Sequence, residues 1–191
     1  MNFTEARYLI RSDLHRYARK SDIFALVKVF LTTPGYRYSF FMRLCHYLKS
    51  KTITRYSIFP FIWLMYRHYM IKYGIIIPYE TKIDSGFYIG YWGGIVVTHL
   101  AKIGKNCNIS PNVNIGRANR GKRKGYPTIG DNVYLAPGAK IVGNVKIGNN
   151  VAIGANCVVV DDVPDNAVVV GVPGKVISYK GSEGYINNTN Y

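Results

Sequence analysis

A period of six residues governs the hydrophobic pattern of the second half of the chain. The residues that carry this period are Ile129, Leu135, Ile141, Ile147, Ile153 and Val159. Four positions after each of them stands a small or branched residue: Val133, Ala139, Val145, Val151, Cys157 and Val163. A period of six fits neither a helix nor a β-meander, and it is typical of a parallel β-helix in which each hexad makes one strand and one turn. The pattern therefore predicts inward-facing aliphatic residues stacked in coils of three hexads.

The repeat has two breaks. Residues 115 and 129 are 14 positions apart where two hexads need 12, and the loop between them is Gly-rich. Its cations are Arg117, Arg120, Lys122, Arg123 and Lys124. Insertions in solenoids gather on the binding face, so the loop 116–128 is interpreted as functional, with a solvated charge run as the alternative. A second slip, of two residues, falls between Ile95 and Val97, just before His99.

The first half of the chain is predicted to be helical. The expected helices start after a cap at Ser12 or Asp13, start after Ser21-Asp22, span 36–51 and span about 60–73, with a break at Pro34-Gly35 and an end at Gly74. Composition separates this half from the rest. Residues 1–74 hold 13 Lys/Arg against 3 Asp/Glu and 17 of the 27 aromatic residues, whereas residues 75–191 hold 12 Lys/Arg against 7 Asp/Glu.

Composition also excludes several classes of protein. A hydrophobic content of 48% argues against disorder, and three cysteines do not make a disulfide framework. The charged N-terminus lacks the apolar core of a signal peptide, and no apolar run reaches the length of a spanning helix, so we expect a cytoplasmic protein. The net charge of +15 indicates an anionic partner. Nucleic acid is disfavoured because no recognition motif is present, and the His and Cys residues of the repeat have no metal-ligand spacing.

The hexads, the loop between them, the segment Gly94-Ile95-Val96-Val97 and the closing Gly171-Val172-Pro173 together resemble the hexapeptide-repeat acyltransferases. The similar branch is that of serine O-acetyltransferases, which includes bacterial capsule and exopolysaccharide O-acetyltransferases. The resemblance implies a mainly β fold, a left-handed parallel β-helix after a small α-helical region, a homotrimer, and acetyl-CoA as the acyl donor without a metal. It also implies three parts: a basic, aromatic helical region 1–74, an acyltransferase domain 75–178, and a tail 179–191.

In this family a histidine takes the proton from the acceptor hydroxyl, which then attacks the thioester. Here Tyr91 stands at the place of that histidine, and Tyr126 stands at the place of a second one. An acidic partner near residues 76–78 is also missing. His99 is the one histidine of the repeat. Three hypotheses therefore remain open: His99 is a relocated base, Tyr91 acts in catalysis, or the chain has lost acetyl transfer.

The resemblance also implies where the substrates bind. In the family the pantetheine arm lies along small residues between neighbouring β-helices, and cations bind the phosphates of CoA. The matching positions are Gly116, Ala136, Pro137, Gly138, Gly154 and Ala155 for the arm, with Arg117 and Lys175 for the phosphates. The alternative is that small residues at hexad corners serve packing alone. Tyr91, Trp92 and Tyr126 are the candidates for contact with the acceptor.

The function expected from these features is O-acetylation of a sugar hydroxyl on a surface polysaccharide or its lipid-linked precursor. The segment 58–69 resembles an interfacial helix, since Trp and Tyr lie beside cations, so peripheral attachment to the inner face of an anionic membrane is a further hypothesis. Two alternatives remain. One is a serine O-acetyltransferase of cysteine biosynthesis, and the other is a β-helix binding protein without catalytic activity.

Overall fold

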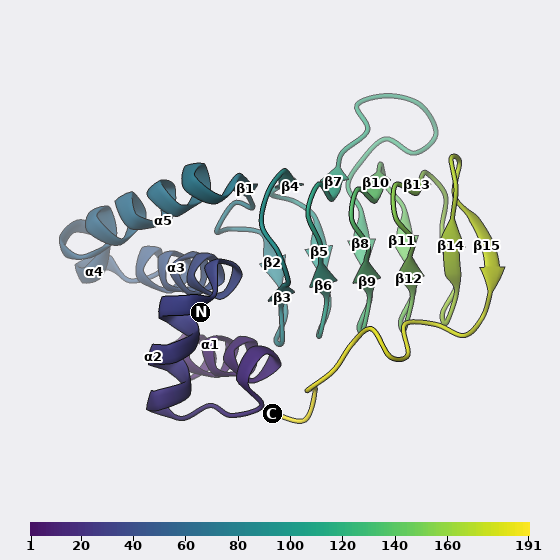
Figure 1. Ribbon diagram of the computed structural model, residues 1–191. Helices are drawn as coiled ribbons and strands as arrows, with labels where there is room; N and C mark the ends of the chain where they lie inside the picture. Colours follow the sequence, from purple (N-terminus) through teal and green to yellow (C-terminus); the bar gives the residue numbers. More distant parts are fainter.

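The molecule consists of a helical region and a β-helix, which lie end to end. The computed structural model describes residues 1–191, apart from the side chains of residues 52 and 53. Helices gather at one end, and the strands follow as successive coils of a three-faced prism (Figure 1). The helices are α1 (Phe3–Ala18), α2 (Ile23–Thr32), α3 (Pro34–Lys49), α4 (Thr52–Ser57) and α5 (Phe59–Tyr73).

Most of the predicted helices are confirmed, and two boundaries are wrong. Asp22 caps α2 by accepting a hydrogen bond from the amide of Ala25, and Gly74 ends α5 in the left-handed region. The prediction of a cap at Ser12 or Asp13 is wrong, because Asn2 caps α1 with a complete capping box with Glu5. The predicted break between two helices is confirmed, but it lies at Thr33 rather than at Pro34-Gly35. Pro34 begins α3, where a first-turn amide needs no partner within the helix. Helix α4 was not predicted.

Three parallel sheets form the faces of the prism. Sheet A contains β1 (Ile75–Ile76), β4 (Ile95–Val97), β7 (Asn114–Gly116), β10 (Lys140–Val142) and β13 (Val158–Val159). Sheet B contains β2 (Lys82–Ile83), β5 (Lys102–Ile103), β8 (Thr128–Ile129) and β11 (Lys146–Ile147). Sheet C contains β3 (Tyr88–Ile89), β6 (Asn108–Ile109), β9 (Tyr134–Leu135), β12 (Ala152–Ile153), β14 (Val168–Val170) and an antiparallel β15 (Lys175–Ser178).

The hexad repeat sets the register of these sheets. Ile129 pairs with Ile147 and Leu135 pairs with Ile153, so one coil takes 18 residues, as the sequence predicts. The inward residues of the six hexads are all buried. The parallel β-helix is therefore confirmed, and its left-handed form is shared with the structural relatives described below. A mainly β fold with a small helical N-terminal region is confirmed as well. The division into functional parts at residues 74 and 178 stays a prediction.

The length of the inserted loop differs from the sequence-based interpretation. Strand β7 leads directly into β8, which lies on the next face, so one hexad and not two should separate Ile115 from Ile129. Ile103 on β5 pairs with Ile129, 26 positions on, where an undisturbed coil needs 18. The loop therefore inserts eight residues rather than two.

The smaller slip of two residues is confirmed in length, because Ile75 pairs with Ile95 and Ile89 pairs with Ile109 at a spacing of 20. Its predicted position between Ile95 and Val97 is wrong, because Val97 pairs with Ile115 at the regular spacing of 18, so the extra residues lie in the corner before Ile95.

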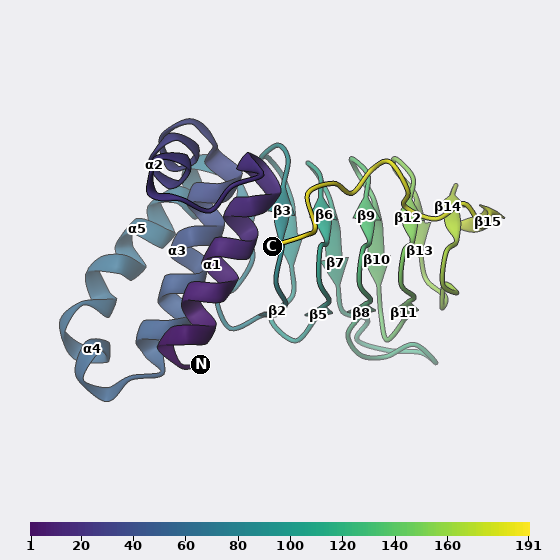
Figure 2. The same cartoon turned by 90° about the horizontal axis from the view of Figure 1, so that it is seen from below.

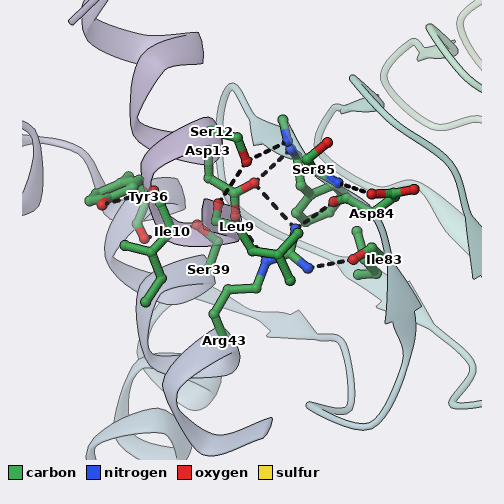
Figure 3. A network of polar contacts seen from close by, with 12 residues as sticks. Leu9, Ile10, Ser12, Asp13, Tyr36, Ser39, Arg43, Ile83, Asp84 and Ser85 are labelled. Atoms are coloured by element: carbon green, nitrogen blue, oxygen red, sulfur yellow. Dashed lines mark hydrogen bonds and ion pairs between the residues drawn. The ribbon is translucent and has the colours of Figure 1, made fainter. Parts of the chain in front are cut away.

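A buried polar network joins the helices to the β-helix (Figure 3). The guanidinium of Arg43 on α3 binds the carboxylate of Asp13 on α1 at 3.0 Å and also donates to the carbonyls of Ile83 and Asp84. Asp13 accepts a further hydrogen bond from the amide of Phe87 at 2.8 Å. Burial raises the pKa of Asp13, and the positive charge of Arg43 opposes that rise. The helical region is thus fixed to the first coil by satisfied buried charges.

The C-terminal segment 179–191 runs back along the β-helix to the helices (Figure 2). The ring of Tyr185 stacks on the ring of Tyr134, with centroids 4.5 Å apart. The hydroxyl of Tyr191 lies 2.9 Å from the Oδ1 of Asn106 and 2.9 Å from the hydroxyl of Ser85. This segment therefore ties the last coils to the first.

Candidate functional site

The site residues predicted from the sequence gather along the two long edges of sheet A. One edge is the row of corners where sheet C turns into sheet A, and we call it the C/A edge. The other is the row of corners where sheet A turns into sheet B, and we call it the A/B edge. The C/A edge carries Tyr91, Trp92, Ala136, Pro137, Gly138, Gly154 and Ala155. The A/B edge carries His99, Gly116, Arg117 and Tyr126.

Two exposed aromatic residues occupy the first corner of the C/A edge. Tyr91 is 72% exposed and Trp92 is 50% exposed, and the Trp92 ring lies 6.2 Å from the ring of Tyr73 at the end of α5. The turn continues through two glycines with positive φ, of which Gly94 leaves no room for a Cβ beside Asn112. The backbone of this corner is therefore tightly constrained, while its aromatic side chains face solvent.

The small residues further along the C/A edge lie on two successive coils. The amide of Asn156 donates to the carbonyl of Pro137 at 2.9 Å, so these corners stack directly. Gly138 has a φ of 78°, and a Cβ there would overlap the side chain of Asn156. A Cβ at Gly154 would lie 2.8 Å from Cγ1 of Val170. Packing alone is a sufficient reason for both glycines, whereas Pro137 and Ala155 are exposed and free to contact a ligand.

The A/B edge brings His99 beside two residues of the loop 116–128. The ring of His99 lies edge-on to the ring of Tyr126, with centroids 6.1 Å apart. The guanidinium of Arg117 donates to the hydroxyl of Tyr126 at 3.3 Å. His99 and Arg117 are exposed, and Tyr126 is half-buried. An imidazole, a phenol and a guanidinium thus share one corner, which can accept a proton and donate hydrogen bonds to an anion.

The loop 116–128 is a closed hairpin anchored to the prism. Ala118 and Gly125 exchange both backbone hydrogen bonds, at 3.1 and 3.0 Å. Arg123 binds the carboxylates of Asp161 at 3.3 Å and Asp162 at 3.0 Å. The hydrogen bond that Arg123 donates to Asp162 raises the pKa of Arg123, and the pKa of Asp162 is lowered by the amide of Lys146 and then by Arg123.

This anchoring was not predicted from the sequence. The sequence signal for it is the pair of adjacent acids, Asp161 and Asp162, after β13, the sheet A strand of a later coil. The sequence alone does not show which coil lies beside them, so it does not identify the cation that they bind. Arg123 is therefore a loop anchor rather than a free phosphate ligand. Within the described residues the other cations of the loop have no carboxylate partner. They are Arg117, Arg120, Lys122 and Lys124.

The remaining predicted positions are separate from both edges or lie at their ends. Lys175 is exposed on β15, the antiparallel strand beyond the last coil. Gly116 lies at the base of the loop, where its carbonyl accepts from the amide of Gly143 at 3.0 Å. No group of three or more His, Cys, Asp or Glu side chains in the described part of the chain is arranged to hold a metal ion. The roles of these residues stay predictions.

Buried thiols are not part of this site. Cys45, Cys107 and Cys157 are all buried in the core. Burial raises the pKa of Cys45 to about 12 and that of Cys107 to about 12, so neither forms a thiolate near neutral pH. Covalent catalysis through cysteine is therefore disfavoured, and direct transfer to an acceptor fits the groups at the surface.

A single chain does not bring the two edges together. Tyr91 precedes β4 and His99 follows it, so the two residues lie at opposite ends of that strand. The small residues of the C/A edge are likewise separated from the loop by the width of sheet A. The predicted catalytic and cofactor positions therefore form two half-sites in one chain.

Comparison with known proteins supports the assignment of a hexapeptide repeat. Residues 126–161 match the family model of the bacterial transferase hexapeptide, six repeats. A serine acetyltransferase of Synechococcus elongatus is 33% identical over 156 residues, which cover 81% of this chain and 62% of that protein. A serine acetyltransferase of Staphylococcus aureus is 42% identical over 108 residues, which cover 56% of this chain and 51% of that protein. The chain thus spans about half to three fifths of the length of these curated relatives.

Solved structures extend the likeness to the helical region. The crystal structure of a serine acetyltransferase from Neisseria gonorrhoeae superposes with a TM-score of 0.75 at 26% identity, and it covers 92% of this chain and 66% of that one. The resemblance to hexapeptide-repeat transferases is therefore confirmed.

The expected function on a surface polysaccharide is contradicted by these findings, since the relatives by sequence and by structure are serine acetyltransferases. The expected saccharide acceptor, free or lipid-linked, is contradicted by the same findings. The physical reason for the error lies in the short basic helical half, which suggested a polysaccharide enzyme although its fold fits that of the serine enzymes.

Proposed function

We propose that the protein is an acetyl-CoA-dependent serine O-acetyltransferase, the alternative that the sequence left open. The observation that carries the proposal is the alignment with the Synechococcus elongatus enzyme, which runs through 81% of this chain at 33% identity. The superposition on the Neisseria gonorrhoeae enzyme supports it further, because it covers 92% of the chain, more than the β-helix alone.

The proposed active form is a homotrimer whose sites lie between copies. Sheet A exposes apolar side chains on its outer surface, among them Ile76, Val96 and Val160. A second copy packed along this sheet would cover these side chains. It would also set the C/A edge of one chain beside the A/B edge of the next, which completes the two half-sites.

In the proposed reaction, His99 accepts the proton of the serine hydroxyl. The hydroxyl oxygen attacks the thioester carbonyl, and a C–O bond forms as the carbonyl becomes an oxyanion. The intermediate then loses the thiolate of CoA, which takes the proton back from His99. Tyr91 and Tyr126 are the proposed donors to the oxyanion or the substrate carboxylate, since each phenol can donate one hydrogen bond.

The acyl donor is proposed to lie along the C/A edge. Exposed Pro137 and Ala155 border that path, and glycines in the same corners allow close approach of a ligand to the backbone. Gly116 and Arg117 at the loop approach the same path from a neighbouring copy. Arg117 and Lys175 are the proposed ligands of the CoA phosphates, because an exposed cation pairs with phosphate by a charge-assisted hydrogen bond.

An acetyl-transfer assay on the full chain tests this proposal. Purified protein is incubated with acetyl-CoA and either L-serine or a panel of monosaccharides, and the O-acetylated product is measured by mass spectrometry. We expect product with L-serine and none above background with the sugars. If CoA binds but no product forms with serine, the chain is a β-helix binding protein in which acetyl transfer is lost.

We also propose peripheral attachment to an anionic membrane through the helices. Residues 23–74 hold eight Lys/Arg and no Asp or Glu. Phe24 is 84% exposed and Leu31 is 66% exposed on α2, and the guanidinium of Arg67 on α5 lies over the exposed ring of Trp63. Exposed apolar side chains beside unopposed cations suit a negatively charged lipid surface. None of the described helices is long and apolar enough to cross a bilayer.

A further inference from the structure

A cavity of about 360 Å³ lies between α1, the turn that follows it and Tyr191. Helix α1 packs on the corner between sheets B and C, where Arg16 donates to the carbonyl of Gly86 and to Oδ1 of Asn108. That corner of the prism is opposite sheet A, which carries the residues proposed for acetyl transfer. The volume falls within the range of small-molecule sites, which is about 300 to 1,000 Å³. This inference therefore does not rest on the proposed acetyl transfer.

Hydrogen bonds hold the walls of the cavity in place. The hydroxyl of Tyr191 lies 2.9 Å from Oγ of Ser85 and 2.9 Å from Oδ1 of Asn106, which fixes the ring beside α1. Figure 2 shows that the segment 179–191 ends there. The hydroxyl of Ser21 donates to the carbonyl of Arg11 at 3.2 Å, which holds the turn against α1. The cavity is therefore preformed in the folded chain.

Two arginines of α1 border the cavity without a carboxylate partner. Arg7 and Arg11 are exposed and four positions apart, so they share one face of the helix, with Cβ atoms about 5 to 6 Å apart. Like charges at this spacing destabilise a helix. In the part of the chain that the structure describes, neither arginine has an ion pair. The acids of the same helix serve other contacts, since Glu5 completes its capping box and Asp13 binds Arg43. Two unbalanced positive charges thus face this cavity.

Two tyrosine rings form an aromatic part of the lining. Tyr8 on α1 is 49% exposed, and its ring centroid lies 6.1 Å from that of Tyr191 at an angle of 59°. Both rings keep part of their surface open, so each can contact a planar or apolar group. Thr4 and Ser21 add hydroxyl groups to the lining. The cavity therefore combines cations with aromatic surface.

From this arrangement we propose that the cavity binds the phosphate monoester of a small organic molecule. A phosphate monoester carries a charge of about −1.5 to −2 at pH 7, which matches two guanidinium groups better than a single carboxylate does. Guanidinium groups bind phosphate oxygens through paired hydrogen bonds. The phosphate lies between Arg7 and Arg11, and the organic part lies against Tyr8 and Tyr191. Because Tyr191 belongs to the segment 179–191, the ligand also holds that segment against α1.

Calorimetric titration of the full chain with phenyl phosphate tests the proposal. Inorganic phosphate serves as a probe without the ring, and phenol serves as a probe without the charge. We expect phenyl phosphate to bind more tightly than either. R7Q/R11Q should weaken its binding about tenfold or more, because hydrogen bonds to a charged group are lost. Both side chains are exposed and Gln is a good helix former, so this variant should stay folded, which circular dichroism checks.

Two further variants separate the charges from the ring. K28Q/K72Q is the matched control, because it removes the same charge from exposed positions on α2 and α5 outside the cavity. It should leave the affinity unchanged. Tyr8→Ala should weaken phenyl phosphate several-fold and leave inorganic phosphate unchanged, since it removes a ring and not a charge.

The proposal is overturned if phenyl phosphate does not bind the wild-type chain or if phenol binds as tightly. It is also overturned if K28Q/K72Q weakens binding as much as R7Q/R11Q, or if folded R7Q/R11Q or Tyr8→Ala keeps the wild-type affinity.

A soluble ester and a lipid headgroup both carry this phosphate group, and vesicle flotation distinguishes the two sources. Vesicles that contain phosphatidate present a phosphate monoester, whereas vesicles that contain phosphatidylglycerol present a diester of the same sign. If R7Q/R11Q loses flotation on phosphatidate vesicles alone, the ligand is a lipid headgroup. If the variant affects both kinds of vesicle equally, or neither, the ligand is a soluble ester.

Discussion

The imidazole of His99 lies edge-on to the phenol of Tyr126, with ring centroids 6.1 Å apart. These two residues are 27 positions apart, and the inserted loop brings them to one corner of the prism. The guanidinium of Arg117 donates a hydrogen bond to the hydroxyl of Tyr126 at 3.3 Å. This corner is therefore a compact half-site in which the histidine of the repeat contacts a tyrosine ring and stays open to solvent.

Replacement of His99 tests the proposed base. His99→Ala should lower kcat/KM for serine acetylation by about 100-fold or more, because loss of a general base typically costs 10²–10⁴ in rate. The side chain is exposed, so the melting temperature should stay unchanged. His68→Ala is the control, since His68 is exposed on α5. If His99→Ala keeps full activity, Tyr91 becomes the remaining candidate, and Tyr91→Phe should then abolish transfer.

Replacement of Arg117 and replacement of Arg123, both in the loop 116–128, should have different effects. Arg117→Ala should raise KM for acetyl-CoA several-fold, because a hydrogen bond to a charged group contributes about 1.5 to 3 kcal/mol before screening by solvent. Arg123→Ala should instead make the loop more sensitive to limited proteolysis, since it removes the link to Asp161 and Asp162. Lys105→Ala, at an exposed corner, is the control. Equal effects of Arg117→Ala and Lys105→Ala on KM would contradict the assignment.

Because its cysteine thiols are buried, the folded chain should lose folding stability at alkaline pH. The thiols of Cys45 and Cys107 have a pKa of about 12 in the folded chain, against about 8.5 for a free cysteine. The unfolded chain therefore loses these protons first, so folding stability is complete below about pH 8.5 and falls as pH rises toward 12. Thermal melts between pH 8 and pH 11 measure this slope.

Cys107→Ala should reduce the slope, because one of the thiols with a raised pKa is removed. Iodoacetamide offers an independent check at pH 8, where the native chain should react slowly and the unfolded chain rapidly. Rapid alkylation of Cys107 in the native chain would show that the thiol is accessible, against this prediction.

The segment 179–191 should contribute measurably to stability. Tyr185→Ala removes the stacking on Tyr134, and an aromatic pair is worth about 0.5 to 1.5 kcal/mol beyond the area it buries. For a chain of this size we expect the melting temperature to fall by about 2 to 4 °C. Tyr179→Ala is the control, because Tyr179 is exposed and has no ring partner among the described residues. A similar fall in both variants would argue against the stacking.

Liposome flotation tests membrane attachment. The chain should float with vesicles that contain anionic lipid and stay in solution with neutral vesicles, since Coulomb attraction to the headgroups is required. F24E/L31E should abolish flotation without unfolding the chain, because both side chains are exposed on α2. Ile177→Glu changes an equally exposed residue on β15 and should have no effect. Failure of the wild-type chain to float on anionic vesicles would exclude this mode of attachment.

Sequence alone determined the repeat and most of the helices. The period of six identified the inward residues from Ile129 to Val159, because each coil repeats the same local requirement for an aliphatic residue that stacks on its neighbours. Asp22 and Gly74 were identified as helix ends because capping is a local interaction. The resemblance carried by these hexads led to the correct family of transferases and to the wrong acceptor.

Tertiary structure decided what depends on register between distant segments. It showed that the loop inserts eight residues, that Arg123 is anchored to Asp161 and Asp162, and that Asp13 pairs with Arg43 rather than capping a helix. It also placed Tyr91 and His99 at opposite ends of β4. The physical reason is that hexads and caps are fixed by neighbours along the chain, whereas ion pairs, cavities and half-sites are fixed by which coil lies beside which.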